Sequence, residues 1–168
     1  MSSSSPHLCL TGATDEGLAK AVAGREDDLV SLRVEDSPSL TSVAPLSALP
    51  NLRWLELHGV GSSAGPLDLT LLAALGRLVH LRLSGVPCSN ATIMPALQKM
   101  TSLQRVFVDD AHLHRTRDFY WFMSLCGSLP DLVEVQVGTE LHGIEDILRM
   151  REGIEELNVA LPVPGPRP

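Results

Sequence analysis

The stretch LPNLRWLEL (residues 49–57) decides the fold that we expect for this chain of 168 residues. From Leu52 to Leu57 it has the form L-x-x-L-x-L, in which Leu55 and Leu57 flank one polar residue. An apolar residue at every second position is typical of a short strand with one buried face. Pro50 stands just before this strand, where a proline ends a preceding helix without removing a needed hydrogen bond of the sheet.

The same L-x-x-L-x-L pattern recurs along the chain, with Val or Ile in place of Leu at some positions. An incomplete copy containing Leu8 and Leu10 opens the chain, and the six complete copies begin 23, 26, 25, 29 and 22 residues apart. A recurring period of this length indicates a repeat architecture. The complete copies are Leu29-Leu32-Val34, Leu52-Leu55-Leu57, Leu78-Leu81-Leu83, Leu103-Val106-Val108, Leu132-Val135-Val137 and Ile154-Leu157-Val159.

Between these copies the apolar residues change to a helical spacing of three and four. Each unit is therefore predicted to run strand, turn, helix, turn, and one such unit cannot bury its own apolar faces. The units must stack, with parallel strands on the inside of a curve and helices on the outside. The predicted helical stripes are Leu67, Leu71, Leu72 and Leu75; Ile93, Leu97 and Met100; Phe119, Phe122, Met123 and Cys126; and Ile144, Ile147, Leu148 and Met150.

The six copies, together with the junctions LPNL (49–52) and LPDL (129–132), resemble the leucine-rich repeat family over roughly Leu8 to Val159. The segment TDEGLA (14–19) is similar to the turn into the helix of the ribonuclease-inhibitor-like, cysteine-containing subclass. The resemblance implies an α/β fold: a right-handed leucine-rich repeat solenoid of about seven strand–helix repeats with a parallel concave sheet.

The ninth position of each repeat departs from this family's usual Asn or Cys, so no asparagine ladder is expected. We expect the repeat domain to span residues 7–161, between a flexible N-terminal tail at 1–6 and a Pro-rich C-terminal tail at 162–168. The residues at the ninth position are Ser37, Val60, Val86, Ala111 and Glu140.

Composition excludes several classes of function. A net charge of −7 argues against a general nucleic-acid-binding protein, because phosphate binding draws on clustered Lys and Arg. No run approaches the roughly 20 apolar residues of a membrane span, so no membrane association is expected. Three cysteines at wide spacings form no disulfide framework, which is typical of an intracellular, cytoplasmic protein. The oligomeric state stays open.

The repeat places the second, third, fifth and seventh positions of each copy on the concave face. Two of the few aromatic residues fall there beside arginines, which is the composition of a protein-binding hot spot. Alternatively, the stems of neighbouring arginines cover these rings as cation–π pairs. The aromatic segment at 118–122 is expected to fill a wider gap between helices; alternatively, Tyr120 and Trp121 form a second candidate surface on the convex side. The predicted partner-binding residues are Arg33, Arg53, Trp54, His80, Arg82, Arg105 and Phe107.

Polar residues with metal-ligating side chains cluster just after the strand of the Leu103-Val106-Val108 copy. Asp109, Asp110, His112 and His114 lie close in sequence, and Cys88 and His58 come at similar strand ends. The two histidines lack the spacing of paired zinc ligands and no CxxC is present, so we expect an ordinary polar loop without a metal.

No motif of a catalytic site is present, and no cofactor is expected. The favoured function is a protein–protein interaction module that binds a macromolecular partner on its concave sheet, in an adaptor, scaffold or recognition role. The alternative is a constitutive structural subunit of a larger assembly. An enzyme would need Cys9, Cys88 or the cluster from Asp109 to His114 in a genuine pocket.

Overall fold

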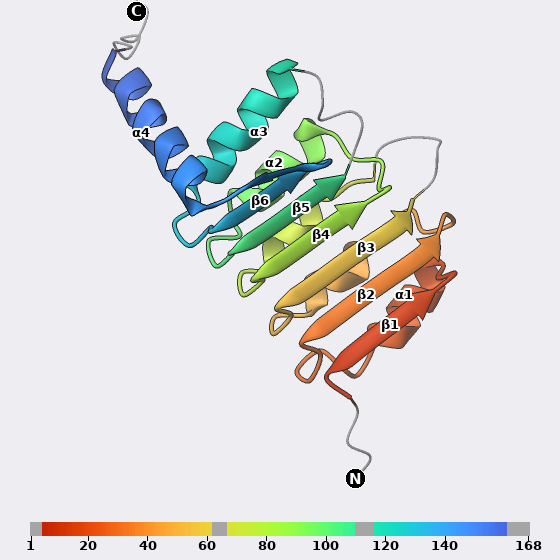
Figure 1. Ribbon diagram of the computed structural model, residues 1–168. Coiled ribbons are helices and arrows are strands. Elements are labelled where there is room, and N and C mark those ends of the chain that lie inside the picture. Colours follow the sequence, from red (N-terminus) through yellow and green to blue (C-terminus); the bar gives the residue numbers. More distant parts are fainter. Residues whose placement is uncertain (1–4, 62–66, 110–115, 161–168) are drawn as a thin grey trace, which may run out of the picture.

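The computed structural model describes residues 5–61, 67–109 and 116–160, which form an α/β structure around one seven-stranded sheet (Figure 1). The strands follow one another in sequence order; β1 to β6 are parallel, and β7 pairs with β6 in the antiparallel direction. The strands are β1 (His7–Thr11), β2 (Ser31–Ser37), β3 (Trp54–Val60), β4 (His80–Ser84), β5 (Arg105–Asp109), β6 (Glu134–Val137) and β7 (Glu140–His142). The helices are α1 (Asp15–Val22), η1 (Ala44–Ala48), η2 (Thr70–Ala74), α2 (Asn90–Leu97), α3 (Thr116–Ser128) and α4 (Ile144–Ala160).

The repeated motif builds the core in columns that run across the strands. In β3, Leu55 and Leu57 point into the core, and Leu52 is buried just before the strand. Their counterparts in the neighbouring strands pair with them in register, so that each column continues from unit to unit. The predicted parallel sheet is therefore confirmed from β1 to β6. One column contains Leu32, Leu55, Leu81, Val106 and Val135, and the next contains Val34, Leu57, Leu83, Val108 and Val137.

Backbone hydrogen bonds repeat with the same regularity where the strands begin. The Val30 carbonyl accepts from both Arg53 N and Trp54 N, at 2.8 and 3.1 Å. The Arg53 carbonyl in turn accepts from Val79 N and His80 N, at 2.8 and 3.0 Å. Because one carbonyl accepts from two successive N–H groups of the next unit, the register between the two strands is fixed. This register decides which side chains are neighbours on the sheet.

The strand ends are shaped by residues with left-handed backbone. Gly59, near the end of β3, has φ 58°, and Gly85, directly after β4, has φ 60°. Asp36 adopts φ 44° at the equivalent place in β2. At the ninth position, Ser37 is fully buried; its Oγ accepts from Ala13 N and donates to the Glu35 carbonyl, both at 2.8 Å. One serine thus bridges two units, although no asparagine stands at this position.

Two of the predicted α-helices are instead short 3₁₀ helices. Leu72 in η2 and the capping residues Leu69 and Leu75 on either side of it are buried, whereas Leu71, which belongs to the predicted buried stripe, is 43% exposed. Leu72 N donates to the Leu69 carbonyl and Leu75 N to the Leu72 carbonyl. A buried residue at every third position fits three residues per turn, and η1 repeats this with Val43, Leu46 and Leu49.

The other helices follow the predicted stripes more closely. Ile93, Leu97 and Met100 are buried in and after α2, and Phe122, Met123 and Cys126 are buried in α3. Thr14 caps α1 by accepting a hydrogen bond from Gly17 N at 3.1 Å, as the TDEGLA segment suggested. In α4, by contrast, Ile147 is buried while Ile144 and Leu148 are exposed.

The last predicted strand, at Ile154-Leu157-Val159, is wrong, because these residues belong to the single helix α4. The residues before this motif, Arg151, Glu152 and Gly153, provide no proline junction like the one before β3. Ile154 and Leu157 are three apart, a spacing that a helix satisfies equally well. The unpredicted strand β7 pairs antiparallel with β6 through a short turn at Gly138 and Thr139.

Candidate functional site

The candidate site lies on the face of the sheet that carries no helix, here called the open face. In Figure 1 the helices α1, α2 and α3 lie behind the sheet, and no helix crosses its front. In β3, Trp54, Glu56 and His58 alternate with the two buried leucines and therefore point to the open face. This agrees with the prediction for the third, fifth and seventh positions of each unit.

Three rings from neighbouring strands form an aromatic cluster at the centre of this face. Trp54 and His80 are stacked, with ring centroids 3.7 Å apart and planes inclined by 9°. His80 and Phe107 lie 5.1 Å apart with a tilt of 40°. Trp54 remains 39% exposed, whereas His80 is only 5% exposed. The tryptophan therefore covers the histidine and offers its other face to solvent.

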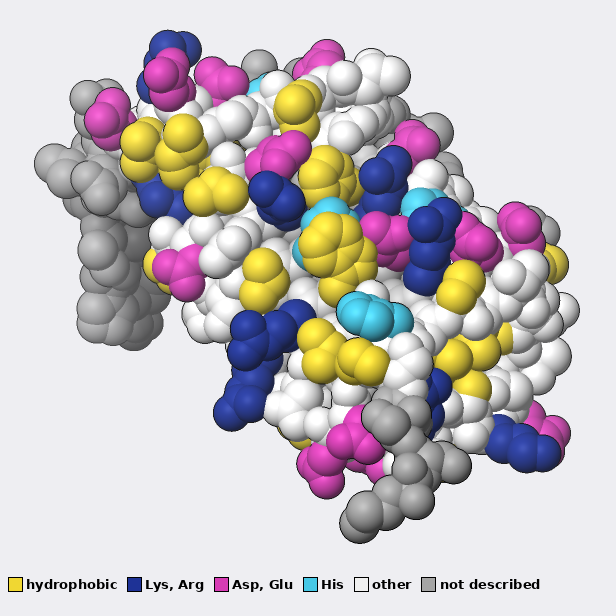
Figure 2. All heavy atoms as spheres, turned by 60° about the horizontal axis from the view of Figure 1, so that its bottom comes forward, with side chains coloured by type: hydrophobic (Ala, Val, Ile, Leu, Met, Phe, Trp, Pro, Cys, Tyr) yellow, Lys and Arg dark blue, Asp and Glu magenta, His cyan; other side chains and the backbone are white. Residues whose placement is uncertain are grey.

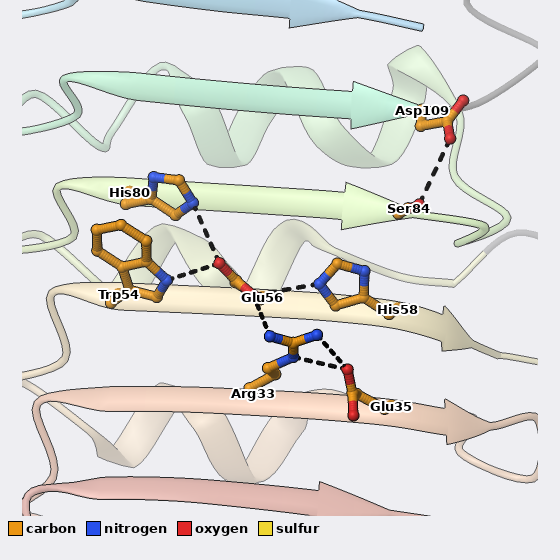
Figure 3. A network of polar contacts seen from close by, with 8 residues as sticks. All are labelled: Arg33, Glu35, Trp54, Glu56, His58, His80, Ser84 and Asp109. Atoms are coloured by element: carbon orange, nitrogen blue, oxygen red, sulfur yellow. Dashed lines mark hydrogen bonds and ion pairs between the residues drawn. The ribbon is translucent and has the colours of Figure 1, made fainter.

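His80 was predicted to be a solvent-facing contact residue, and its burial corrects that prediction. The alternation correctly places it on the open face, but the larger Trp54 ring from β3 lies against it. Within the described residues, neither ring nitrogen of His80 has a hydrogen-bond partner, and His80 Nε2 lies 3.6 Å from Glu56 Oε1 (Figure 3). Burial lowers its pKa from 6.5 to about 4; the Glu56 carboxylate opposes this, and the charges of Arg105 and Arg82 add to it. His80 is therefore neutral at physiological pH.

Glu56 connects the cluster to its neighbours through both carboxylate oxygens (Figure 3). Trp54 Nε1 donates to Glu56 Oε1 at 2.9 Å. His58 Nε2 lies 3.2 Å from Glu56 Oε2, and an Arg33 guanidinium nitrogen lies 3.7 Å from the same oxygen. Burial alone would raise the Glu56 pKa, but the hydrogen bonds from Trp54 and His58 and the nearby positive charges lower it overall. Glu56 is thus a carboxylate with both oxygens engaged.

Two of the predicted arginines are paired with carboxylates of the protein itself. Arg33 Nε donates to Glu35 Oε1 at 2.7 Å, in addition to its contact with Glu56. Arg105 Nε lies 3.2 Å from Glu134 Oε2 on the next strand. These two side chains therefore hold the face together and contribute little net positive charge.

The other two predicted arginines have no such partner. Arg82 lies over the Phe107 ring, with its guanidinium carbon 5.6 Å from the ring centroid, so part of the predicted cation–π cover exists. Arg53 is exposed and directly precedes Trp54. Within residues 5–61, 67–109 and 116–160, no carboxylate lies within 4.0 Å of the guanidinium of Arg53 or Arg82. In Figure 2, side chains of both signs, Lys or Arg and Asp or Glu, surround hydrophobic and histidine side chains near the middle of the face.

A shallow hollow opens beside the aromatic cluster, at the ends of β4, β5 and β6. It is open to solvent, and Ser84 Oγ donates to Asp109 Oδ2 at 3.4 Å next to it. It does not enclose a volume from which water is excluded. The lining residues are Arg82, Leu83, Phe107, Val108, Asp109, Gln136 and Gly138.

The remaining candidate residues are dispersed or lie outside the described part. Cys88 and Cys126 are buried and Cys9 is exposed, and burial raises the pKa of the Cys126 thiol. No group of three or more His, Cys, Asp or Glu residues that could hold a metal occurs in the described ranges. Asp110, His112 and His114, and the side chains of Tyr120 and Trp121, lie outside the described residues.

The sequence analysis did not assign Glu56 to the site. Its position was nevertheless readable: it occupies the fifth position of its copy, two residues after Trp54, and pairs in register with Arg33 and Arg82. An acidic residue between two basic neighbours on one face predicts cross-strand ion pairs.

No family model and no curated protein sequence matches the chain. Among solved structures, an internalin from Listeria monocytogenes is similar, with 19% sequence identity and a TM-score of 0.47. The similarity covers 73% of this chain and 33% of the internalin, so the chain spans about a third of that protein's length. Nothing about function follows from a similarity at this level. No helix in the described ranges is long and apolar enough to cross a bilayer.

Proposed function

We propose that this protein is a leucine-rich repeat interaction module that binds a protein partner on the open face of its sheet. Its units would wind as a right-handed solenoid, in which the open face is the concave one. Its role would be recognition or scaffolding as an intracellular adaptor without catalytic activity, in keeping with three cysteines that form no disulfide. The exposed Trp54 ring, stacked on His80, is the observation that carries this proposal.

An exposed tryptophan with a fixed position is well suited to binding. Its stacking on His80 and its hydrogen bond to Glu56 hold the ring in one orientation before a partner arrives. A rigid aromatic group loses little conformational entropy on binding, and Trp and Arg are the residues most enriched in hot spots. The paired charges around it supply a polar rim.

The test is an affinity purification from the native cell with quantitative mass spectrometry. Trp54→Ala removes the exposed ring, and we expect specific partners to decrease at least about ten-fold. Leu71→Ala is the matched control, because Leu71 is a similarly exposed apolar residue (43%) on η2, on the helical side. Circular dichroism confirms that both variants are folded. Partners that persist on folded Trp54→Ala, or that are lost equally from Leu71→Ala, would contradict binding at the open face.

A second candidate function, a constitutive subunit of a larger assembly, is favoured by the apolar surface at the C-terminal end. Leu141 on β7 is 60% exposed, and Ile144 and Leu148 on α4 are also exposed. Permanent interfaces bury such groups. Replacing Leu141 and Leu148 by serine distinguishes the two functions: if partners depend on these residues and survive Trp54→Ala, the structural role is correct.

A further inference from the structure

We propose that the β1 edge of the sheet is a docking site for a second copy of this chain. The β1 strands of two copies pair in the antiparallel direction about a two-fold axis at Cys9, so that the two sheets become one. This contact is separate from the open face and does not depend on the proposed function.

The strand β1 has a neighbour on one side. It pairs with β2 over all five of its residues without a bulge, and Figure 1 shows it at the end of the sheet with no other described element beyond it. Its sequence, HLCLT, contains no Lys, Arg, Asp, Glu or Pro. Charged residues, prolines and bulges are common means by which an edge strand avoids pairing with another chain. Since β1 has none of them, its edge is open to a further strand.

The backbone hydrogen bonds to β2 show which groups face this edge. The Pro6 carbonyl accepts from Ser31 N at 3.0 Å, and Gly12 N donates to the Glu35 carbonyl at 3.2 Å. In a parallel pair, alternate residues of a strand bond to the same neighbour, so the even-numbered residues of β1 face β2. The odd-numbered residues turn their N–H and C=O groups to the free edge. These residues are His7, Cys9 and Thr11.

A two-fold axis at Cys9 matches these groups with one another. Cys9 then lies opposite Cys9 of the copy, and His7 lies opposite Thr11. Residues opposed in this way exchange two N–H···O bonds, so three such pairs give about six hydrogen bonds. His7 N donates to Ser5 Oγ at 3.3 Å, a bond that pairing exchanges for one to the copy.

The core side of β1 is also incomplete. Leu8 and Leu10 are only partly buried, whereas their partners in β2, Leu32 and Val34, are fully buried. In the proposed pairing Leu8 lies opposite Leu10 of the copy, and each core column continues across the axis with a leucine. A second copy therefore covers the apolar surface that β1 leaves partly exposed.

Charge and size set the strength of this contact. The chain has a net charge of −7, but the paired strands themselves carry no acidic or basic side chain apart from His7, so no like charges lie directly opposite one another. Five residues per copy are far fewer than the roughly 20–30 per side of a standard stable interface. The dimer is therefore weak and depends on protein concentration.

The test is analytical ultracentrifugation of the full-length protein between about 1 µM and about 1 mM. We expect a reversible monomer–dimer equilibrium with a dissociation constant on the order of 10–100 µM. Cys9→Pro removes the outward N–H at the axis but no bond to β2, so it should raise this constant more than about ten-fold. Cys9→Ser keeps the N–H and is the matched control, with a change of less than about two-fold. Circular dichroism confirms folding, and Thr11→Pro is the second variant.

Cross-linking tests the register. Cys9 is exposed while Cys88 and Cys126 are buried, and the two Cys9 Cα atoms of the dimer lie about 5.5 Å apart. A short bismaleimide should therefore link two copies of the wild type but not of Cys9→Ser. In the Cys9→Ser background, copies with His7→Cys should link to copies with Thr11→Cys. Either variant alone should link much less, because its two cysteines lie about 13 Å apart.

Three results would overturn the proposal. The first is a protein that stays monomeric up to about 1 mM, which leaves the edge to a strand of another protein. The second is a dimer that both folded proline variants retain, which places the contact on another surface. The third is efficient linking of His7→Cys copies to one another, which indicates a parallel pairing. None of these results bears on partner binding at the open face.

Discussion

Among single residues, His80 makes the open face sensitive to pH. Its ring is enclosed by Trp54 and Phe107, and burial lowers its pKa from 6.5 to about 4 against the opposing charge of Glu56. The unfolded chain therefore binds this proton at a higher pH than the folded protein does. The contribution of neutral His80 to stability is complete above about pH 6.5 and is lost as the pH falls toward 4.

Replacing the titrating ring tests this linkage. Between about pH 7 and about pH 4.5, protonation of His80 should cost the wild type roughly 2 kcal/mol of unfolding free energy. His80→Phe keeps a flat ring under Trp54 but binds no proton. Its free energy of unfolding should therefore fall by roughly 2 kcal/mol less than that of the wild type between these two pH values. Urea unfolding at both pH values measures the difference. His7→Gln, at an exposed position in β1, is the control, and equal losses in His80→Phe and wild type would refute the assignment.

At the scale of elements, one side chain joins the two C-terminal helices. Arg151 in α4 donates from Nε to the Gly127 carbonyl at 2.6 Å and also to the carbonyls of Leu129 and Pro130. These carbonyls lie at and just after the end of α3, where a helix has no backbone donors left for them. A positive charge is also favourable at a helix C-terminus. Arg151 therefore docks α4 onto α3.

Removing this contact should loosen both helices. Arg151→Ala leaves partly buried carbonyls without a donor and should cost about 2 kcal/mol of unfolding free energy. It should also speed amide hydrogen exchange in α3 and α4. Arg149→Ala, on the same helix, loses only an exposed pair with Asp146 at 3.6 Å and should change stability by less than about 0.5 kcal/mol. Similar effects of the two substitutions would show that the carbonyl contacts do not hold α4 in place.

Across the whole molecule, stability depends on position along the stack, because each unit packs chiefly on its neighbours. Leu81 in β4 has a parallel strand on each side and is 1% exposed. Leu8 occupies the equivalent column in β1, which pairs only with β2, and it is partly buried. A Leu→Ala substitution should therefore lower the free energy of unfolding by different amounts in the two units.

The comparison of Leu81→Ala with Leu8→Ala tests this. Leu81→Ala should cost about 3–4 kcal/mol, since it removes buried methyl groups and leaves a cavity. Leu8→Ala should cost about 1 kcal/mol, because solvent already reaches this side chain. Denaturant unfolding curves with unchanged slopes would give both values. If Leu8→Ala is as costly as Leu81→Ala, β1 is as tightly packed as the central strands.

The parts of the structure that repeat with a fixed period could be predicted from the sequence. The parts in which the same apolar spacing fits two kinds of secondary structure could not. The alternation in the copies from Leu8 to Val137 placed the core columns and the open face correctly. The buried spacing of three at Leu69, Leu72 and Leu75 could have revealed the 3₁₀ helix, but the neighbouring Leu71 gave a helical spacing as well. The strand predicted at Ile154-Leu157-Val159 was wrong because a spacing of three residues fits both a helix and the residues that lead into a strand.

The sequence by itself determined the stacking of strands and the identity of the open-face residues, since a period of two decides which side chains share a face. Only the tertiary structure decided which of those side chains contact, pair with or bury one another. Register brings Trp54 onto His80 and Arg33 close to Glu56, which leaves the Trp54 ring exposed and His80 buried. In the part of the chain that the structure describes, it also leaves Arg53 and Arg82 without a carboxylate within 4.0 Å. The contacts of Trp54 with His80 and of Arg33 with Glu56 join residues more than twenty positions apart, which no local pattern encodes.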